Sequence, residues 1–441
     1  MKKVAFYTLG CKVNQYETNA MIEKFIKRNY EIVDFEDVAD IYVVNTCTVT
    51  NMSDRKSRQI IRRVKQINPK SILAVTGCYA QVAAKELEKI EEIDLIVGNT
   101  EKKDIVNIIE NIVGADDSVC PQKIENTQIN LTDINKQKDF VDFGPTTYTD
   151  KTRAVIKVQD GCNNFCSYCI IPYAKGRVRS RKLESILEEI KNVIKTGIQE
   201  VVITGIHIAS YGIDFKEDDI RLIDLLEEIN KIEGLKRIRI GSLEPNIITD
   251  DFVERLKKVD KICDHFHLSL QSGCTETLKR MNRKYTTEDF EKVVKRLRNA
   301  FPNVALTTDI IVGFPGETEK EFETTYNYLK KINFYKMHVF KYSPRKGTRA
   351  AVMPNQVDGN IKEKRSRKLI ELSNENEKKF LNKYIGKEVE VLFEQKEDEY
   401  FKGHTSNYIV VKTKHDKLEN KLIKIKITET SKLELLGDIL K

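Results

Sequence analysis

The sequence predicts an α/β protein with an amino-terminal parallel-sheet α/β domain, a central open, partial (β/α)6 TIM-like barrel and a small carboxy-terminal β-barrel. Apolar strands alternate with amphipathic helices in two stretches, 1–113 and 151–360, and this alternation favours parallel sheets. A third stretch, 384–441, changes to short strands divided by glycine and polar turns. A chain of 441 residues is long enough to give each part its own core.

The amino-terminal stretch is expected to hold strands at 4–9, 41–45, 72–76 and 95–97, with helices at 15–28, 53–67, 80–91 and 101–113. Cys11, Cys47 and Cys78 each follow one of the first three strands, in the turn before a helix. The carboxyl ends of parallel strands form one edge of a sheet, and ligands bind there. A single cysteine at such a place is more often buried filler, but three at the same register favour a three-cysteine metal cluster.

A basic helix is expected after Cys47, because Ser53 or Asp54 can cap it and Arg and Lys recur through residue 65. It is either a solvated face or a phosphate-binding surface beside the proposed cluster. Residues 114–150 lose the strand-helix pattern and predict a linker, in which Cys120 is isolated and receives no role.

The central stretch predicts six strands, at 153–159, 200–205, 236–241, 264–270, 304–313 and 335–342. Helices separate them, near 182–196, 220–231, 249–259, 287–299 and 317–331. Six units are short of the eight that close a full barrel, so we expect a partial barrel with a lateral mouth. The loop after its first strand, residues 162–169, should lie on the catalytic face.

That loop carries Cys162, Cys166 and Cys169, a spacing that suits three corners of a 4Fe-4S cluster. The fourth iron would have no protein ligand and could bind a small molecule. A zinc site would want a fourth Cys or His, which the loop lacks, since the next cysteine is Cys263. Structural disulfides are improbable in a chain without an export signal. The spacing therefore predicts an iron-sulfur centre.

Other strand ends of the central stretch carry polar or small residues, including Gly205 and Gln271. Each is weak alone, since glycine ends ordinary strands, but together on one face they suit a cofactor that needs clearance and hydrogen bonds. His207 follows Gly205 and could be a ligand or base, although a histidine at a strand end is more often structural.

A basic strip, Lys175 to Lys182, follows the cysteine loop and includes Arg177, Arg179 and Arg181. The strip favours contact with a polyanion such as nucleic acid, while any single arginine could equally brace the loop. A connecting helix at 361–383 leads to the terminal barrel, for which strands near 388–393, 408–412 and 422–427 are expected. Small β-barrels often bind RNA, but this one could merely pack against the centre.

The composition is moderately basic, with 32% charged residues and a net charge of +8. This makes nucleic acid a plausible partner without proving it. We expect no membrane span, because no apolar run is long enough. The first ten residues begin like a signal peptide, but Cys11, Lys12 and Asn14 break the apolar run. A cytoplasmic protein with reduced cysteines is therefore expected.

The cysteine loop, with Tyr168 in the aromatic position before its last cysteine, resembles the signature of radical S-adenosylmethionine enzymes. Residues 8–17, Cys47, Cys78, the block 160–181 and residues 203–212 and 241–245 together resemble the methylthiotransferase family, over nearly the full chain. The segments around Cys11 and Cys162 look like its MtaB branch, which acts on N6-threonylcarbamoyladenosine at position 37 of tRNA. Lys175 stands where that branch is expected to have arginine.

The resemblance implies a UPF0004-type domain over 1–113, a linker at 114–150, a radical barrel over 151–360, a connecting helix at 361–383 and a TRAM-like barrel over 384–441. It implies two 4Fe-4S clusters, one on Cys162, Cys166 and Cys169 and one on Cys11, Cys47 and Cys78. S-adenosyl-L-methionine would be the second cofactor, with Tyr168, Gly205 and Gln271 expected near it.

The implied reaction is methylthiolation of carbon 2 of the modified adenosine. Its implied partners are the tRNA anticodon loop, a reducing electron donor and a sulfur donor. Two alternatives stay open: action on N6-isopentenyladenosine, as in the MiaB branch, and an iron-sulfur RNA-binding sensor without turnover.

Overall fold

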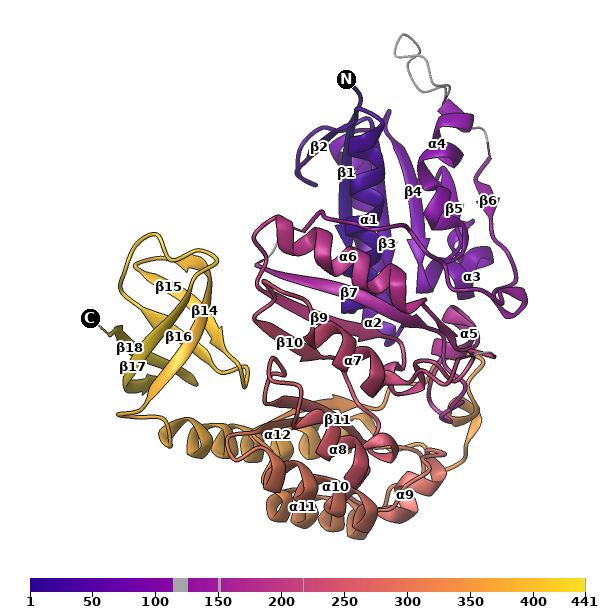
Figure 1. The fold of residues 1–441 in the computed structure, drawn as a ribbon. Coiled ribbons are helices and arrows are strands. Elements are labelled where there is room, and N and C mark those ends of the chain that lie inside the picture. Colours follow the sequence, from indigo (N-terminus) through magenta and orange to yellow (C-terminus); the bar gives the residue numbers. More distant parts are fainter. Residues whose placement is uncertain (114–125, 150–151, 217, 441) are drawn as a thin grey trace.

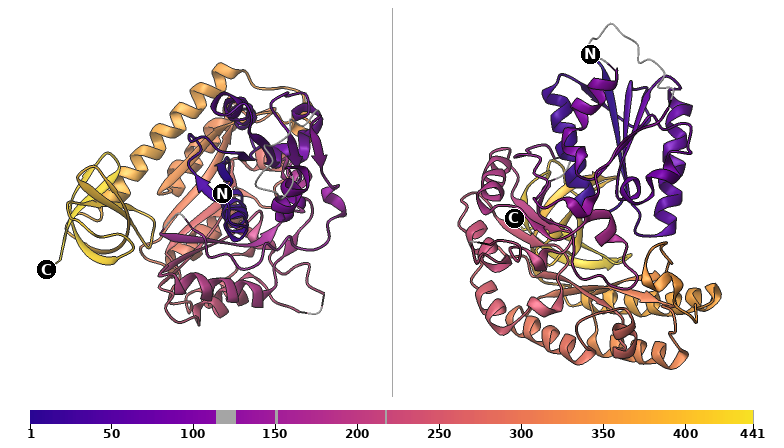
Figure 2. Two further views of the ribbon diagram at one scale, coloured as in Figure 1. Left: turned by 90° about the horizontal axis from the view of Figure 1, so that it is seen from above. Right: turned by 90° about the vertical axis from the view of Figure 1, so that its right-hand side faces the viewer.

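The computed structural model describes residues 1–113, 126–149, 152–216 and 218–440, and it divides into the three parts expected from the sequence (Figure 1). The amino-terminal sheet stands over one end of the central barrel, and the carboxy-terminal barrel lies at its side (Figure 2). The predicted fold class is confirmed. No helix within these ranges has the length and apolar character needed to cross a membrane.

The amino-terminal sheet has six parallel strands in the order β2-β1-β3-β4-β5-β6. Their bounds are β1 Lys3–Thr8, β2 Glu31–Val33, β3 Ile41–Thr46, β4 Ile72–Gly77, β5 Leu95–Val97 and β6 Gln128–Asn130. Strands β2 and β6 were not predicted from the sequence. Both are three-residue edge strands with few buried side chains, so they lack the apolar pattern that marks a strand. The segment interpreted as a linker thus contributes β6 to this sheet.

Helices cover both faces of this sheet, which is why β3 and β4 are buried along their whole lengths. One face packs against α1 Lys12–Lys27 and α4 Ile105–Val113, and the other against α2 Asn51–Ile67 and α3 Cys78–Leu87. A short 3-10 helix, η1 Glu101–Asp104, precedes α4. The carboxyl ends of β1, β3 and β4 therefore meet at one edge.

The central barrel consists of six parallel strands, as the sequence predicts, in two hydrogen-bonded sheets. The strands are β7 Arg153–Asp160, β9 Glu200–Gly205, β10 Arg237–Ile240, β11 His265–Gln271, β12 Ala305–Val312 and β13 Lys336–Lys341. Single bridges, Ile238 to Ile262 and Leu243 to Leu268, join the two sheets. Among the described residues β13 does not pair with β7, so the barrel is open.

One strand of the first barrel sheet was not expected, the two-residue β8 Arg179–Ser180, which runs antiparallel to the end of β7. The barrel helices are α5 Ile171–Lys175, α6 Leu183–Lys195, α7 Leu222–Asn230, α8 Asp250–Leu256, α9 Thr275–Arg280, α10 Thr287–Ala300 and α11 Glu319–Ile332. Four 3-10 turns complete this part of the chain, at η2 Ile134–Lys136, η3 Ile208–Ser210, η4 Pro245–Ile247 and η5 Arg349–Val352.

The long helix α12 Gly359–Asn382 leads from the central barrel to the terminal one (Figure 2). The terminal barrel is closed, in the order β14-β15-β16-β18-β17. Its strands are β14 Glu388–Glu397, β15 Tyr400–Thr405, β16 Val410–Thr413, β17 Leu422–Ser431 and β18 Glu434–Ile439. It docks on the central barrel through polar contacts: Arg237 donates to the His404 carbonyl over 3.0 Å, and Asn407 donates to the Asn303 carbonyl over 2.9 Å.

Candidate active site

Three cysteines lie at the carboxyl edge of the amino-terminal sheet. Cys11 follows β1, Cys47 follows β3, and Cys78 begins α3 directly after β4. A Cβ placed on Gly10 would lie 3.0 Å from the Cys47 Sγ, so the turn after β1 packs against Cys47. Burial, with Cys47 and Cys11 nearby, raises the pKa of the Cys78 thiol to about 12. The sheet thus gathers three residues that are far apart in the sequence.

The second set of cysteines lies on the loop after β7. Its entry depends on Gly161, which has φ +71°, and a Cβ there would lie 1.7 Å from the Arg177 carbonyl oxygen. Burial raises the pKa of the Cys162 thiol to about 11, and burial followed by the charge of Cys166 raises that of Cys169 to about 12. Three thiols are therefore packed together in a short loop.

Two hydrogen-bond donors are directed at this second set. The Asn164 backbone N–H donates to the Cys162 Sγ over 3.4 Å, and the Arg283 Nη1 donates to the Cys166 Sγ over 3.3 Å. Arg283 is held by Glu244 at 2.5 Å and by the Ser269 carbonyl at 3.1 Å. Donors to sulfur favour the thiolate, which is the form that binds metal.

Both sets fit an iron-sulfur cluster better than a single ion. Among the described residues, no three Cys, His, Asp or Glu side chains converge on one point that would hold a metal ion. In a 4Fe-4S cube each thiolate binds a different iron, so its ligands surround a volume instead of converging on a point.

The remaining cysteines stand apart from these sets. Cys263 is buried beside Arg239, and Cys274 precedes α9 and donates to Glu276 over 3.1 Å. Cys120 lies outside the described residues.

His207 braces the second cysteine loop through both ring nitrogens. Its Nδ1 lies 2.6 Å from the Ser210 hydroxyl and its Nε2 lies 3.1 Å from the Asn164 side-chain amide. Burial lowers its pKa, so the neutral ring is favoured. Of the two roles considered from the sequence, these contacts favour the structural one.

Two of the three residues expected near the cofactor share a cavity of about 250 Å³. Tyr168 and Gln271 line it together with Val49 and Thr50, which follow Cys47 in the amino-terminal domain. Gly205 does not line this cavity. A Cβ on Gly205 would lie 2.9 Å from the Gln159 carbonyl oxygen, so this glycine allows close packing between β9 and β7.

A buried charge network joins the amino-terminal domain to the barrel. Glu17 of α1 accepts from Lys102 over 2.6 Å, from Lys157 over 2.7 Å and from Lys175 over 2.7 Å. Asp160 accepts from Lys157 over 2.6 Å. The three lysines hold the pKa of Glu17 well below its usual range, against the opposing effect of its burial. This network fixes the position of α1 relative to the first barrel strand.

The basic strip after the cysteine loop is mostly internal, which corrects the nucleic-acid interpretation given to it. Lys175 belongs to the buried network, Arg179 donates to the Lys175 carbonyl over 2.8 Å, and Arg181 pairs with Glu189. Arg179 and Arg181 are each only 1% exposed. Arg177 is exposed and lies over the Phe165 ring at 4.6 Å. Spacing alone could not separate bracing arginines from exposed ones.

The basic helix α2 keeps its exposed positive charge. Arg55, Lys56, Arg62 and Arg63 are all exposed. Arg58 turns toward Tyr79 and lines a cavity with Arg345 and Lys346.

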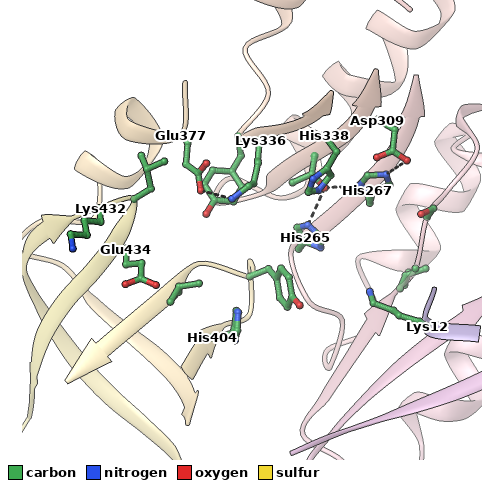
Figure 3. Close-up of a pocket in the computed structure, with 18 residues that line it drawn as sticks. Lys12, His265, His267, Asp309, Lys336, His338, Glu377, His404, Lys432 and Glu434 are labelled. Atoms are coloured by element: carbon green, nitrogen blue, oxygen red, sulfur yellow. Dashed lines mark hydrogen bonds and ion pairs between the residues drawn. The ribbon is translucent and has the colours of Figure 1, made fainter. Parts of the chain in front are cut away.

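The lumen of the central barrel holds a larger cavity, about 590 Å³, that the sequence analysis did not anticipate (Figure 3). His265 and His267 of β11, Asp309 of β12 and His338 of β13 line it, with His404 from the terminal barrel. Polar residues at every second position of adjacent barrel strands were the available signal, because alternate side chains point into a barrel.

A smaller cavity of about 240 Å³ adjoins the amino-terminal domain and is lined by Cys11, Lys12, Arg153, Arg239 and Tyr408. Lys12 lines both of these cavities, and Asp309 lines both the lumen and the cavity at Tyr168. The lumen therefore adjoins the cavity at Cys11, where Lys12 lies, and the cavity at Tyr168, where Asp309 lies.

Sequence comparison places this architecture among known enzymes. Residues 156–329 match the Radical SAM superfamily, and residues 3–98 match the uncharacterized protein family UPF0004. Over 97% of its length the chain is 44% identical to the threonylcarbamoyladenosine tRNA methylthiotransferase MtaB of Bacillus subtilis, covering 94% of that protein. The chain belongs to the radical S-adenosylmethionine methylthiotransferase family.

Other members of this family are nearly as similar. The MtaB protein of Aquifex aeolicus is 41% identical, with 96% of this chain and all of that protein covered. A tRNA-2-methylthio-N(6)-dimethylallyladenosine synthase of Clostridium novyi is 36% identical, with 100% of this chain and 97% of that protein covered. The chain is therefore an enzyme of this family, whose cofactors are 4Fe-4S clusters and S-adenosylmethionine, and tRNA is the substrate class.

Among solved structures, the radical S-adenosylmethionine methyltransferase TsrM of Kitasatospora setae matches with a TM-score of 0.59. It covers 80% of this chain and 77% of its own at 16% identity, so the likeness concerns the fold alone.

Proposed function

We propose that this methylthiotransferase acts on carbon 2 of N6-threonylcarbamoyladenosine at position 37 of tRNA, giving the 2-methylthio derivative. The proposal is carried by the two relatives of that named activity, at 44% and 41% identity over nearly the whole chain. It is supported by two sets of three cysteines, one after strands β1, β3 and β4 and one on the loop after β7, and by a cavity at Cys11 that adjoins the barrel lumen.

The target atom explains the need for a radical. Carbon 2 of adenine has no leaving group and no acidic proton, so ionic chemistry has nothing to act on. When bound, a reduced 4Fe-4S cluster with S-adenosylmethionine would supply abstraction of the hydrogen atom, and a second cluster would supply the sulfur, whose methyl group would come from another S-adenosylmethionine.

The two cysteine sets receive different roles in this proposal. Cys162, Cys166 and Cys169 hold the cluster that activates S-adenosylmethionine, with Arg283 and Asn164 directing donors at two of the sulfurs. Cys11, Cys47 and Cys78 hold the cluster that supplies sulfur. Because the sets lie on separate domains, the Glu17 network must keep them in register.

The cofactor would lie beside Tyr168 and Gln271, whose cavity adjoins the loop after Cys47. Gly205 would act indirectly, by letting β9 approach β7 beneath the cysteine loop. The base would enter the adjoining lumen, where Asp309 marks the junction of the two spaces. Enclosure between barrel and sheet excludes water from the reacting atoms.

The anticodon loop of tRNA would be bound by exposed cations near these cavities. Arg55, Lys56 and Arg62 of α2, together with Arg177, remain available to phosphates, and the terminal barrel would act as a TRAM-like RNA-binding unit. Turnover would also need an external reductant and an external sulfur source. Since tRNA is the substrate, we place the reaction in the cytoplasm.

One alternative keeps a specific observation in its favour: relatives that modify dimethylallyladenosine are 36% identical over the same length. Membership in an enzyme family decides against the sensor without turnover. Nucleoside analysis of tRNA from a deletion strain tests the proposal directly. Loss of 2-methylthio-N6-threonylcarbamoyladenosine, restored by the wild-type gene but not by Cys166→Ala, is expected. Loss of only the methylthiolated dimethylallyladenosine would refute the assigned substrate.

A further inference from the structure

Of the described lysines that line the lumen, Lys336 pairs with Glu377, whereas Lys12 and Lys432 have no carboxylate within ion-pair distance, and of these two Lys12 also lines the cavity at Cys11. Lys12, the first residue of α1, is exposed to the space between Cys11 and the barrel lumen (Figure 3). None of the carboxylates that the structure describes forms an ion pair with its ammonium group. A positive charge that faces an enclosed cavity without a counter-ion favours an anionic ligand there.

The two arginines of the same cavity are already engaged. Arg153 pairs with Glu394 of the terminal barrel at 3.0 Å. Arg239 pairs with Glu200 at 2.7 Å and donates to the Ser406 carbonyl over 2.8 Å. Each arginine is thus paired with a carboxylate, and Lys12 is the cation left for a ligand among the described residues that line this cavity.

The ring of Tyr408, which also lines this cavity, contacts both Arg153 and Arg239. Its ring lies 5.1 Å from the Arg153 guanidinium and 4.6 Å from that of Arg239, and its backbone is held at φ +67°. Arg153 and then Lys12 hold the pKa of its hydroxyl below the usual value, against its burial. The cavity at Lys12 is therefore lined by cations and by a polar hydroxyl, which suits an anionic group.

The proposed substrate carries such a group. A threonylcarbamoyl substituent joins the threonine nitrogen to the adenine N6 through a carbonyl and leaves the α-carboxylate free, whereas a dimethylallyl substituent is an uncharged hydrocarbon. In adenine, carbon 2 and the carbon that bears N6 flank the same ring nitrogen, N1. A base whose carbon 2 faces the Cys11 set thus directs its N6 substituent along the same edge, within reach of the neighbouring residue.

We propose that Lys12 binds the α-carboxylate of the threonylcarbamoyl group and thereby selects this substrate over uncharged N6 substituents. The inference rests on the proposed function. A charged hydrogen bond from Lys12 to the substrate carboxylate strengthens binding of the correct base, whereas an uncharged substituent would leave the Lys12 ammonium desolvated and without a partner.

A phosphate of the RNA backbone is the other anion that Lys12 could meet. The two sources are separated by the substrate, because replacing the α-carboxylate with its methylamide removes one charge and leaves every phosphate in place. If Lys12 contacted a phosphate instead, replacing Lys12 would weaken the binding of both RNAs equally.

The test uses the full-length reconstituted protein and two anticodon stem-loops, one with N6-threonylcarbamoyladenosine and one with its methylamide. Binding is measured as Kd by fluorescence anisotropy, and KM and kcat are measured for the methylthiolated product. Wild type should prefer the carboxylate roughly 10- to 150-fold in Kd and KM. Lys12→Met should lose that preference, and Lys12→Arg should recover part of it.

Lys432→Met is the matched control, since Lys432 is an exposed lysine at the opposite end of the lumen (Figure 3). It should keep the carboxylate preference. Iron content and a cooperative unfolding transition confirm that each variant is folded and loaded.

The outcomes separate this inference from the function on which it rests. An unchanged preference in folded Lys12→Met, a loss of preference in Lys432→Met, or equal weakening of both RNAs would each overturn the role of Lys12. If wild type forms no methylthiolated product from either RNA yet modifies a dimethylallyl-bearing one, the proposed substrate itself is wrong.

Discussion

Removing the carboxylate of Glu17 should loosen the amino-terminal domain from the barrel. Glu17 is 1% exposed and is the shared partner of Lys102, Lys157 and Lys175. In Glu17→Gln, Lys157 keeps Asp160 at 2.6 Å, but the Lys102 and Lys175 ammonium groups lose the only carboxylates that the described structure gives them within ion-pair distance. Removing one partner of a buried ion pair lowers the free energy of unfolding by about 3–5 kcal/mol, because the remaining charge stays buried without a counter-charge.

The free energy of unfolding is measured by urea titration, followed by circular dichroism. With a slope of about 2 kcal/mol/M, a loss of about 4 kcal/mol lowers the midpoint of the transition that includes the amino-terminal domain by roughly 2 M. Glu36→Gln is the control, because the Glu36–Arg63 pair is about half exposed and such pairs contribute at most about 1 kcal/mol.

The same variant should separate two activities. The barrel and its own cysteine loop remain, so 5'-deoxyadenosine should still form from S-adenosylmethionine. Methylthiolated product should fall further, because sulfur transfer needs both cysteine sets in register. If Glu17→Gln unfolds too readily to assay, adding Lys102→Met removes one orphaned charge and should recover stability. A midpoint within about 0.3 M of wild type, corresponding to about 0.6 kcal/mol at that slope, would refute the reasoning.

The pKa of Glu17 in the folded protein is depressed, so ionised Glu17 stabilises the fold above the ordinary carboxyl pKa of about 4.3, and this stabilisation is lost as the pH falls through the folded-state pKa. The urea midpoint of wild type should therefore fall more steeply below about pH 5 than the urea midpoint of Glu17→Gln. Cys47→Ala and Cys166→Ala should each lose about half of the bound iron, since each cysteine set is assigned one of two four-iron clusters. Of the two variants, only Cys47→Ala should still yield 5'-deoxyadenosine. Methylthiolated tRNA from Cys47→Ala at wild-type yield would contradict the sulfur-supplying role of the amino-terminal set. Arg177→Ala should lower the slope of log K against log salt for tRNA by about 0.9 if it contacts one phosphate, measured by filter binding. Arg181→Ala should instead lower the free energy of unfolding by about 3–5 kcal/mol in the same urea titration, since it leaves buried Glu189 without its arginine partner. A stable Arg181→Ala with a reduced salt slope for tRNA binding would show that Arg181 contacts RNA.

The sequence predicted the strands that are buried and long, since their apolar runs depend only on local pattern. β3 and β4, for example, are six-residue strands that are buried throughout, and the alternation around them indicated the parallel sheet and the shared edge of the cysteines. The edge strands β2 and β6 carry too few apolar residues to be recognised, because an edge strand is stabilised by its neighbour.

The fate of the charged residues could not be predicted from pattern. Arg177 and Arg179 are two positions apart in one basic strip, yet Arg177 is exposed and Arg179 is buried against the Lys175 carbonyl. The difference arises from the hairpin that β8 forms with β7, which places Arg179 against the Lys175 and Arg177 carbonyls and is a tertiary feature. His265 and His267 were missed for another reason, since their inward direction depends on the strands closing into a barrel.

Helix α1 combines the roles that these residues play. Its first residue, Lys12, faces the cavity, and one turn later the Tyr16 hydroxyl donates to Glu189 of α6 over 3.2 Å while Glu17 enters the buried network. Apolar packing tolerates sliding, whereas buried ion pairs and hydrogen bonds are satisfied in one arrangement only. The contacts of Tyr16 and Glu17 therefore fix both the distance of Cys11 from the barrel and the position of the Lys12 ammonium. Substrate selection by Lys12 and sulfur delivery by the cluster on Cys11 would then both depend on the position of α1, so a change that shifts α1 should disturb both.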